Sequence, residues 1–148
     1  MDKLSLYDFI DDYNEFWQKV LEEEKEKLKN ISSCDLALVQ KSIKDQQAVI
    51  MQIENLEEKR IALQKECGLE NKSLREILED AEEGFKPRLK NALDLFQKTM
   101  EEIKFYNNKS NTIAKEHLDA IGVSPDEEKL GGYAPDRETK GVLLGKKI

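Results

Sequence analysis

The sequence predicts an all-α protein: a long antiparallel helical hairpin, a short helix and a third long helix in a coiled-coil-like bundle, then a flexible C-terminal tail. Apolar residues recur at spacings of three and four over three long stretches, the period of a helix with one buried face. The charged fraction is 37%, against roughly 25% in an average globular chain. The seven glycines and three prolines fall at the expected helix ends and in the tail.

The first helix is expected to span about residues 4–30. Its apolar stripe consists of Leu6, Phe9, Ile10, Tyr13, Trp17, Val20, Leu21 and Leu28. The charge run over residues 22–27 is expected to form a solvated face, because oppositely charged side chains three or four residues apart pair on a helix surface.

The second helix is expected from Leu36 to Cys67, after the helix-capping residues of segment 32–35. Its stripe consists of Leu36, Val39, Ile43, Ile50, Ile53, Leu56 and Leu63 in near-heptad spacing. Gly68 follows as a C-terminal cap. Because the connection to the first helix is only a few residues long, the two helices should be antiparallel neighbours with a coiled-coil-like seam.

A short third helix is expected after Ser73, with Gly84 at its end. Ser73 and Glu76 have the spacing of a capping box. The last long helix should begin near Pro87, since proline suits a first helical turn, and stop at Gly122. Its stripe is Leu89, Leu93, Phe96, Met100, Ile103, Ala114, Leu118 and Ile121. So long a helix is not stable alone and must pack along the hairpin.

The chain changes character after Gly122, where helical and strand periodicity both fail. We therefore expect one helical domain over residues 1–122 and a flexible tail over 123–148. The tail has one apolar island, Val142-Leu143-Leu144.

Charge and hydropathy argue against two classes of partner. The net charge is −7 and Lys and Glu alternate, so there is no basic face for a nucleic acid. No stretch approaches the roughly 18 apolar residues that span a bilayer, so no membrane insertion is expected. The N-terminus also lacks the features of a signal peptide. These observations predict a cytoplasmic protein.

The sequence offers no basis for an enzyme or a metal protein. His117 is the single histidine, whereas helical di-iron sites need a histidine from each of two helices. Cys34 and Cys67 lie near opposite ends of one predicted helix, too far apart for a disulfide or a shared zinc ion. No phosphate-binding glycine loop is present. We expect no catalytic residue, no metal and no cofactor.

The middle of the last helix is unusually polar for its position. It reads Tyr106-Asn107-Asn108-Lys109-Ser110-Asn111, and asparagine is a poor helix former. One interpretation is a polar layer that fixes the helix register. The other is a patch left imperfectly sealed so that a partner can dock.

Several segments together resemble the FlgN family of flagellar type III export chaperones along nearly the whole chain. The first helix has an acidic second half. The second contains Leu56-Glu57-Glu58-Lys59-Arg60, similar to the family's Leu-Glu-x-x-Arg segment. Residues 108–114, Asn-Lys-Ser-Asn-Thr-Ile-Ala, are similar to its Asn-x-x-Asn segment. The tail segments Tyr133-Ala134-Pro135-Asp136 and Leu144-Gly145-Lys146-Lys147-Ile148 resemble endings of Gram-positive members.

The resemblance implies a chaperone that binds hook–filament junction (hook-associated) proteins, prevents their premature assembly and delivers them to the export apparatus. An amphipathic client helix would lie in an apolar groove. The predicted client-binding residues are Phe96, Met100, Ile103, Asn108 and Asn111 of the last helix, with Val142, Leu143 and Leu144 of the tail. Tyr133 is the candidate for a separate contact with the export gate.

The alternative interpretation is a coiled-coil adaptor or scaffold that forms stable homo-oligomers, whose seam would be used in self-association. A monomer or a weak homodimer favours the chaperone, and an obligate oligomer favours the scaffold. Sedimentation distinguishes the two.

Overall fold

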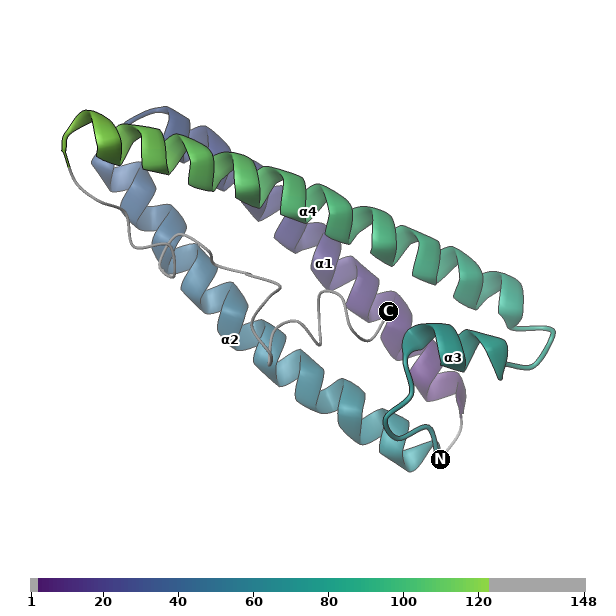
Figure 1. The fold of residues 1–148 in the computed structure, drawn as a ribbon. Helices are drawn as coiled ribbons and strands as arrows, with labels where there is room; N and C mark the ends of the chain where they lie inside the picture. The colour runs from purple at the N-terminus through teal and green to yellow at the C-terminus, as the bar shows by residue number, and fades with distance from the viewer. Residues whose placement is uncertain (1–2, 123–148) are drawn as a thin grey trace.

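The computed structural model describes residues 3–122 and shows four helices and no strand within that range. They are α1 (Lys3–Ser32), α2 (Leu36–Glu66), α3 (Leu74–Glu79) and α4 (Lys86–Ala120) (Figure 1). The predicted all-α class and the order of three long helices and one short helix are confirmed. Residues 123–148, with Tyr133 and the island Val142–Leu144, lie outside the described residues.

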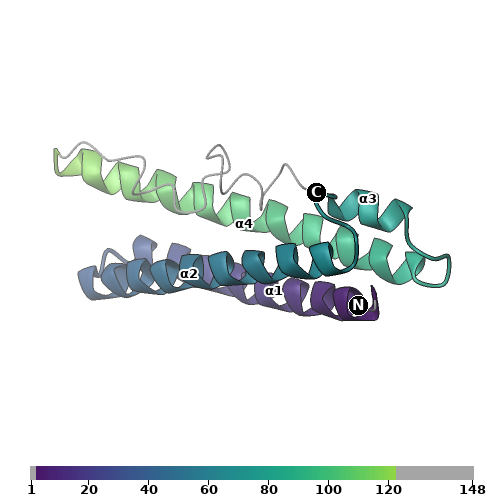
Figure 2. The same ribbon diagram turned by 90° about the horizontal axis from the view of Figure 1, so that it is seen from below.

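Helix α1 is the centre of the bundle. Helices α2 and α4 each run along α1, whereas α2 and α4 make hardly any direct contact with each other. Short helix α3 packs on α4, at the end of the bundle that holds the start of α1 (Figures 1 and 2). The three long helices therefore pack as two helix pairs that share α1.

The helix ends follow from local chemistry. Asp35 is the N-cap of α2, and its carboxylate accepts hydrogen bonds from the amides of Ala37 and Leu38 at 3.0 and 3.4 Å. Ser73 caps α3 by accepting from the amide of Glu76 at 3.1 Å. Such caps satisfy amides that have no partner inside the helix. Gly68, just after α2, has a φ of 74°, a left-handed conformation that glycine adopts without strain.

The apolar core occupies the half of the bundle near α3. Trp17 is fully buried, and Phe96 stands against it with ring centroids 6.4 Å apart. Around this pair α1 contributes Tyr13, Val20 and Leu21, α2 contributes Val49 and Ile53, and α4 contributes Met100 and Ile103. A second cluster joins Leu6, Tyr7 and Ile10 of α1 to Ile77 of α3, to Ala81 just after α3, and to Leu89 and Ala92 of α4.

The expectation that the charge run of residues 22–27 forms a solvated face is wrong at two positions. Glu24 is 1% exposed and Lys27 is 7% exposed. Both point into the bundle because α4 continues beyond the apolar core and covers this side of α1. Periodicity alone does not reveal them, since a charged residue on a buried stripe looks like any other charged residue.

The predicted apolar stripe of α2 is also wrong in part. The side that faces the bundle consists of Ser42, Val49, Ile53, Arg60 and Gln64, while Leu36 and Ile43 are 70% and 54% exposed. Apolar residues occur on more than one side of this helix, so its sequence does not select a single face. The polar residues of α1 that lie opposite decide which side is turned inward.

Within residues 3–122, no helix combines the length and the apolar character that crossing a bilayer would require.

Candidate binding groove

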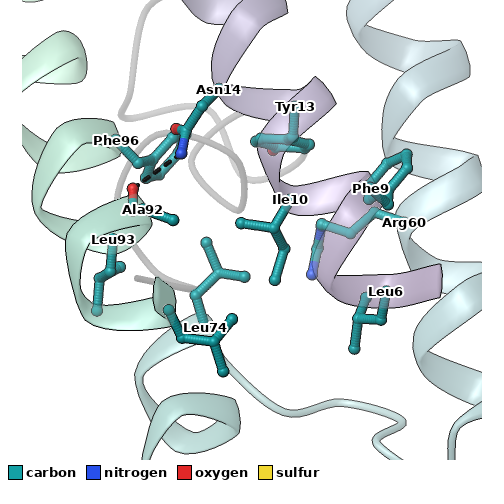
Figure 3. A pocket seen from close by; sticks show the side chains of 11 residues that line it. Leu6, Phe9, Ile10, Tyr13, Asn14, Arg60, Leu74, Ala92, Leu93 and Phe96 are labelled. Carbon is teal, nitrogen blue, oxygen red and sulfur yellow. Dashed lines mark hydrogen bonds between the residues drawn. The ribbon is translucent and has the colours of Figure 1, made fainter. Parts of the chain in front are cut away.

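A mostly apolar recess near the core lies along α1, between α4 and the end of α2. Helix α1 forms its floor, α2 contributes Arg60, α3 contributes Leu74 and α4 forms the remaining wall (Figure 3). The lining residues are Leu6, Phe9, Ile10, Tyr13, Asn14, Arg60, Leu74, Leu89, Ala92, Leu93 and Phe96. We call this recess the α1–α4 groove.

The walls of the α1–α4 groove are mostly apolar and partly open. Phe9 and Leu74 are only half-buried, although both pack against the core clusters. Deeper in the groove, the rings of Tyr13 and Phe96 are 5.6 Å apart. Nine of the eleven lining residues are buried, so Phe9 and Leu74 are the accessible apolar part of this recess.

A buried hydrogen bond holds α4 in place beside the groove. The side-chain amide of Asn14 on α1 donates to the backbone carbonyl of Ala92 on α4 at 2.9 Å (Figure 3). This contact fixes the register of the two helices where Leu93 and Phe96 enter the groove. A buried amide of this kind is costly when it is left unpaired, so the geometry should resist sliding of α4.

The α2 side of the groove carries a buried ion pair. The guanidinium of Arg60 donates through Nε to Glu57 at 3.0 Å, makes a second bond to the same carboxylate, and bonds Gln64. Burial by itself lowers the pKa of Arg60, but the hydrogen bond and charge of Glu57 outweigh it and raise this pKa. The pKa of Tyr13, opposite the pair, is raised by burial and then by Glu57. Arg60 therefore stays charged, and Tyr13 stays neutral, at the groove.

The other half of the bundle is polar inside. The ammonium group of Lys27 lies 2.9 Å from Glu24, and donates to the side-chain oxygens of Gln46 and Asn107, each at 2.8 Å. One buried lysine thus joins α1, α2 and α4. Beyond it, Asn30 donates to Ser42 at 2.9 Å. We call the set Glu24, Lys27, Gln46 and Asn107 the polar cluster.

The predicted client-binding residues of α4 do not form one exposed surface. Phe96, Met100 and Ile103 are each 3% exposed or less and face α1, and of these Phe96 lines the groove. Asn108 is exposed and Asn111 is partly exposed. The stripe pattern correctly placed these three apolar residues on one face of α4. That face, however, is the one that packs against α1.

Sequence reasoning missed Leu74 as a residue of the groove, and noted Arg60 only as part of a motif. Leu74 enters from α3, and the α1–α4 groove exists only because α3 folds back on α4. The local sequence of α3 does not predict this contact. The capping sequence at Ser73 shows where α3 begins, and leaves its direction open.

Among residues 3–122, no group of three or more His, Cys, Asp or Glu side chains is arranged to hold a metal ion. Cys34 and Cys67 do not form a disulfide.

The family model described as FlgN protein matches residues 1–125, which include every helix of the structure. Neither the comparison with curated proteins nor that with solved structures finds a match to the chain. The family match covers far more than half of the chain, and the fold is the all-helical one that the sequence predicts. The chain belongs to the FlgN family, a family of flagellar export chaperones rather than enzymes.

Proposed function

We propose that this protein is a cytoplasmic chaperone that binds hook–filament junction proteins, prevents their premature assembly and delivers them to the flagellar export apparatus. Family membership supports the chaperone role. The observation that carries the proposal is the apolar recess along α1, where Phe9 and Leu74 stay half-buried while α2 and α4, both packed on α1, hardly meet each other. A client helix lying there would complete a four-helix arrangement.

The client would be an amphipathic terminal helix that aggregates or assembles when its apolar face is free. In the α1–α4 groove its apolar residues would contact Phe9, Leu74 and the edge of Phe96, which line the recess. A helix that binds in such a groove is held by apolar side chains that recur at helical spacing. The Arg60–Glu57 pair at the rim would exclude helices whose charges do not match.

The α4 residues predicted from the sequence would have two different roles in client binding. Met100 and Ile103, beneath the surface, would hold α4 against α1 and so shape the groove. Asn108 and Asn111, which retain solvent exposure, would offer side-chain hydrogen bonds to the client. In the tail, Val142, Leu143 and Leu144 would extend the client site, and Tyr133 would contact the export gate.

The first experiment is co-elution on a sizing column. The full chain is mixed with a hook–filament junction protein from the same bacterium, and with the same protein truncated at its terminal helices. Retention of the full client and loss of the truncated one is expected. Separate elution of the full client would contradict the proposal.

A second experiment tests the position of the client. Phe9→Glu and Leu74→Glu place a charge on the half-buried rim of the groove, which an apolar client surface cannot pair. We expect each to weaken client binding about tenfold or more, or roughly 1.4 kcal/mol, by calorimetric titration. Leu95→Glu, on an α4 residue outside the groove and 43% exposed, is the matched control and should bind as the wild type does.

The remaining predicted residues are tested in the same titration. Asn108→Ala with Asn111→Ala should weaken binding several-fold, and Val142→Ser with Leu144→Ser should do the same. Tyr133→Ala should leave client affinity unchanged and reduce export in cells. Wild-type affinity in the first two variants would remove those residues from the client site. Phe96→Ala with Ile103→Ala is a poor test, because both side chains belong to the core.

A further inference from the structure

The outward side of α2 carries a continuous exposed stripe that the bundle does not use. Its positions recur at spacings of three and four along the helix and every one of them is exposed: Leu36, Gln40, Ile43, Gln47, Met51, Glu54, Glu58, Ile61 and Lys65. Four large apolar side chains stand in it, Leu36 (70% exposed), Ile43 (54%), Met51 (66%) and Ile61 (52%). We call these nine residues the α2 stripe.

The α2 stripe has the spacing of a coiled-coil seam, but it is separate from the seam with α1. The side of α2 that packs on the bundle consists of Ser42, Val49, Ile53, Arg60 and Gln64. Residues that recur every three to four positions form one line on a helix. Because α2 has 31 residues, it is about 46 Å long. The α2 stripe is therefore long enough to receive a second helix along several turns.

We propose that the occupant of the α2 stripe is α2 of a second copy of this chain, in antiparallel orientation about a two-fold axis near Met51. The residues on either side of Met51 are complementary. Lys44 precedes Met51 by seven positions and Glu58 follows it by seven. In an antiparallel pair centred on Met51, Lys44 of each copy therefore lies beside Glu58 of the other. Both residues are exposed.

The same orientation brings the apolar residues together. Ile43 and Ile61 lie eight and ten positions on either side of Met51. The antiparallel pair thus places Ile43 of one copy near Ile61 of the other at both ends of the contact, with the two Met51 side chains at its centre. A two-fold contact uses the same patch on both copies, as this arrangement requires. A parallel pair in register would instead set Lys44 against Lys44 and Glu58 against Glu58, which is unfavourable.

Small residues beside the α2 stripe allow two helices to approach closely. Ala37, Ala48 and Ala62 are exposed and lie next to it on the outward side. Polar residues at Gln40, Gln47 and Glu54 interrupt the apolar positions, and polar residues in a seam reduce stability while they specify orientation. A single pair of helices also buries less area than a standard stable interface. We therefore expect the dimer to be weak and reversible.

The contact leaves the α1–α4 groove unoccupied. Of the residues that line the groove, α2 supplies only Arg60, which faces the bundle and is not part of the α2 stripe. Dimer formation and client binding consequently use different residues. The inference does not depend on the identity of the client.

The test is sedimentation velocity of the full chain at concentrations up to about 200 μM, a range in which a weak helix–helix contact associates. The wild type should shift from monomer towards dimer as concentration rises. Met51→Lys sets two like charges at the axis and should raise the dissociation constant at least about tenfold. Leu95→Lys, an exposed leucine of α4, is the control and should sediment like the wild type.

Charge reversal tests the orientation. Lys44→Glu alone and Glu58→Lys alone should each weaken the dimer several-fold, and the two changes in one chain should restore it. A wild type that stays monomeric throughout, or a Met51→Lys variant that dimerises normally, would overturn the proposal. Failure of the double reversal to restore association would overturn the antiparallel orientation.

Client co-elution is measured on the same Met51→Lys protein, with circular dichroism to establish that it is helical. Normal client retention by this monomeric variant is expected. Failure of the wild type to retain the client would remove the proposed function and would not touch the sedimentation result. The two proposals can therefore fail separately.

Discussion

The two halves of the bundle are held together by different chemistry. Near α3, α1 meets α4 through large apolar and aromatic residues, with Trp17 fully buried against Phe96. Near the α1–α2 connection, the same two helices meet through the polar cluster around Lys27. The apolar half gains stability from surface removed from water. The polar half gains little net stability from its hydrogen bonds, and it specifies how the three long helices align.

The apolar and the polar contacts therefore have different roles in the bundle. Apolar packing tolerates small shifts along the helices, whereas a lysine that must satisfy acceptors on three helices allows one register. Asn14 plays a similar part inside the apolar half through its bond to Ala92. The groove walls are thus kept in position by a few polar contacts, while most of the folding free energy comes from the aromatic core. The following predictions separate these contributions.

The largest effect is expected from Trp17→Ala. Removing this buried ring leaves a cavity between α1 and α4, and should lower the free energy of unfolding by about 4 kcal/mol. Chemical denaturation followed by circular dichroism measures it. Phe105→Ala, whose ring is 57% exposed, is the control and should change stability by less than about 0.5 kcal/mol. Equal effects of the two changes would contradict the assigned core.

A somewhat smaller effect is expected from Lys27→Met. The change leaves Glu24 buried without its cation and removes the donor to Gln46 and Asn107, which should cost about 3 kcal/mol. Replacing both charges, in Glu24→Gln with Lys27→Met, should recover much of the loss, since an uncompensated buried charge is the main penalty. If Lys27→Met were as stable as the wild type, the polar cluster would not be closed in solution.

The helix caps at the two ends should each contribute about 1 kcal/mol. Asp35→Ala removes the cap of α2 at the polar end, and Ser73→Ala removes that of α3 at the apolar end. Asp35→Asn keeps an accepting oxygen and should stay close to the wild type. A loss from Asp35→Asn as large as that from Asp35→Ala would show that charge, rather than the hydrogen bond, matters at this cap.

The smallest effect is a difference in pH dependence between the halves. Burial lowers the pKa of Lys27 below its usual 10.5, with Glu24 opposing, so the folded state holds this proton less tightly than the unfolded chain. Its contribution to stability therefore rises as the pH increases from that lowered value to 10.5. Burial raises the pKa of Tyr13 above 10.0. Its contribution is complete below pH 10 and falls as the pH rises above it.

Denaturant unfolding of the wild type and of each variant, at a series of pH values between 8 and 11, measures both trends as differences in the free energy of unfolding. Tyr13→Phe should lose less stability than the wild type above pH 10, because no buried phenol then ionises on unfolding. Lys27→Met should lack the gain that Lys27 contributes below pH 10.5. Parallel curves for the wild type and both variants would contradict these assignments.

Most ends of the helices were predictable because each depends on a few adjacent residues. The prediction that the short helix ends at Gly84 is wrong, because α3 already ends at Glu79 with Asp80 as its C-cap. The cap at Asp35, the left-handed Gly68 and the cap at Ser73 occur where local sequence chemistry places them. The antiparallel hairpin followed in turn from the short connection between α1 and α2. The buried faces of α1 and α4 were also predictable, since both have one dominant apolar stripe that includes Trp17 and Phe96.

The candidate site was less predictable. Phe96, Met100 and Ile103 were expected to meet a client, and they lie in the core. An apolar stripe shows that a helix face is covered, without showing whether its own chain or a partner covers it. Residues 106–111 are partly buried and partly exposed, and the interpretation that they form a docking patch stays a prediction. Asn107 is buried in the polar cluster as a register-fixing layer requires, whereas Asn108 is exposed.

The sequence by itself determined the helices, their order, most of their ends and the inward sides of α1 and α4, because these depend on local capping chemistry and on a single strong period. Only the tertiary structure decided which side of α2 turns inward, that Glu24 and Lys27 are buried, and that Leu74 of α3 reaches the groove. Each of these depends on residues distant in the chain. A buried charge becomes stable only when its partners from other helices are in place, and no local pattern contains them.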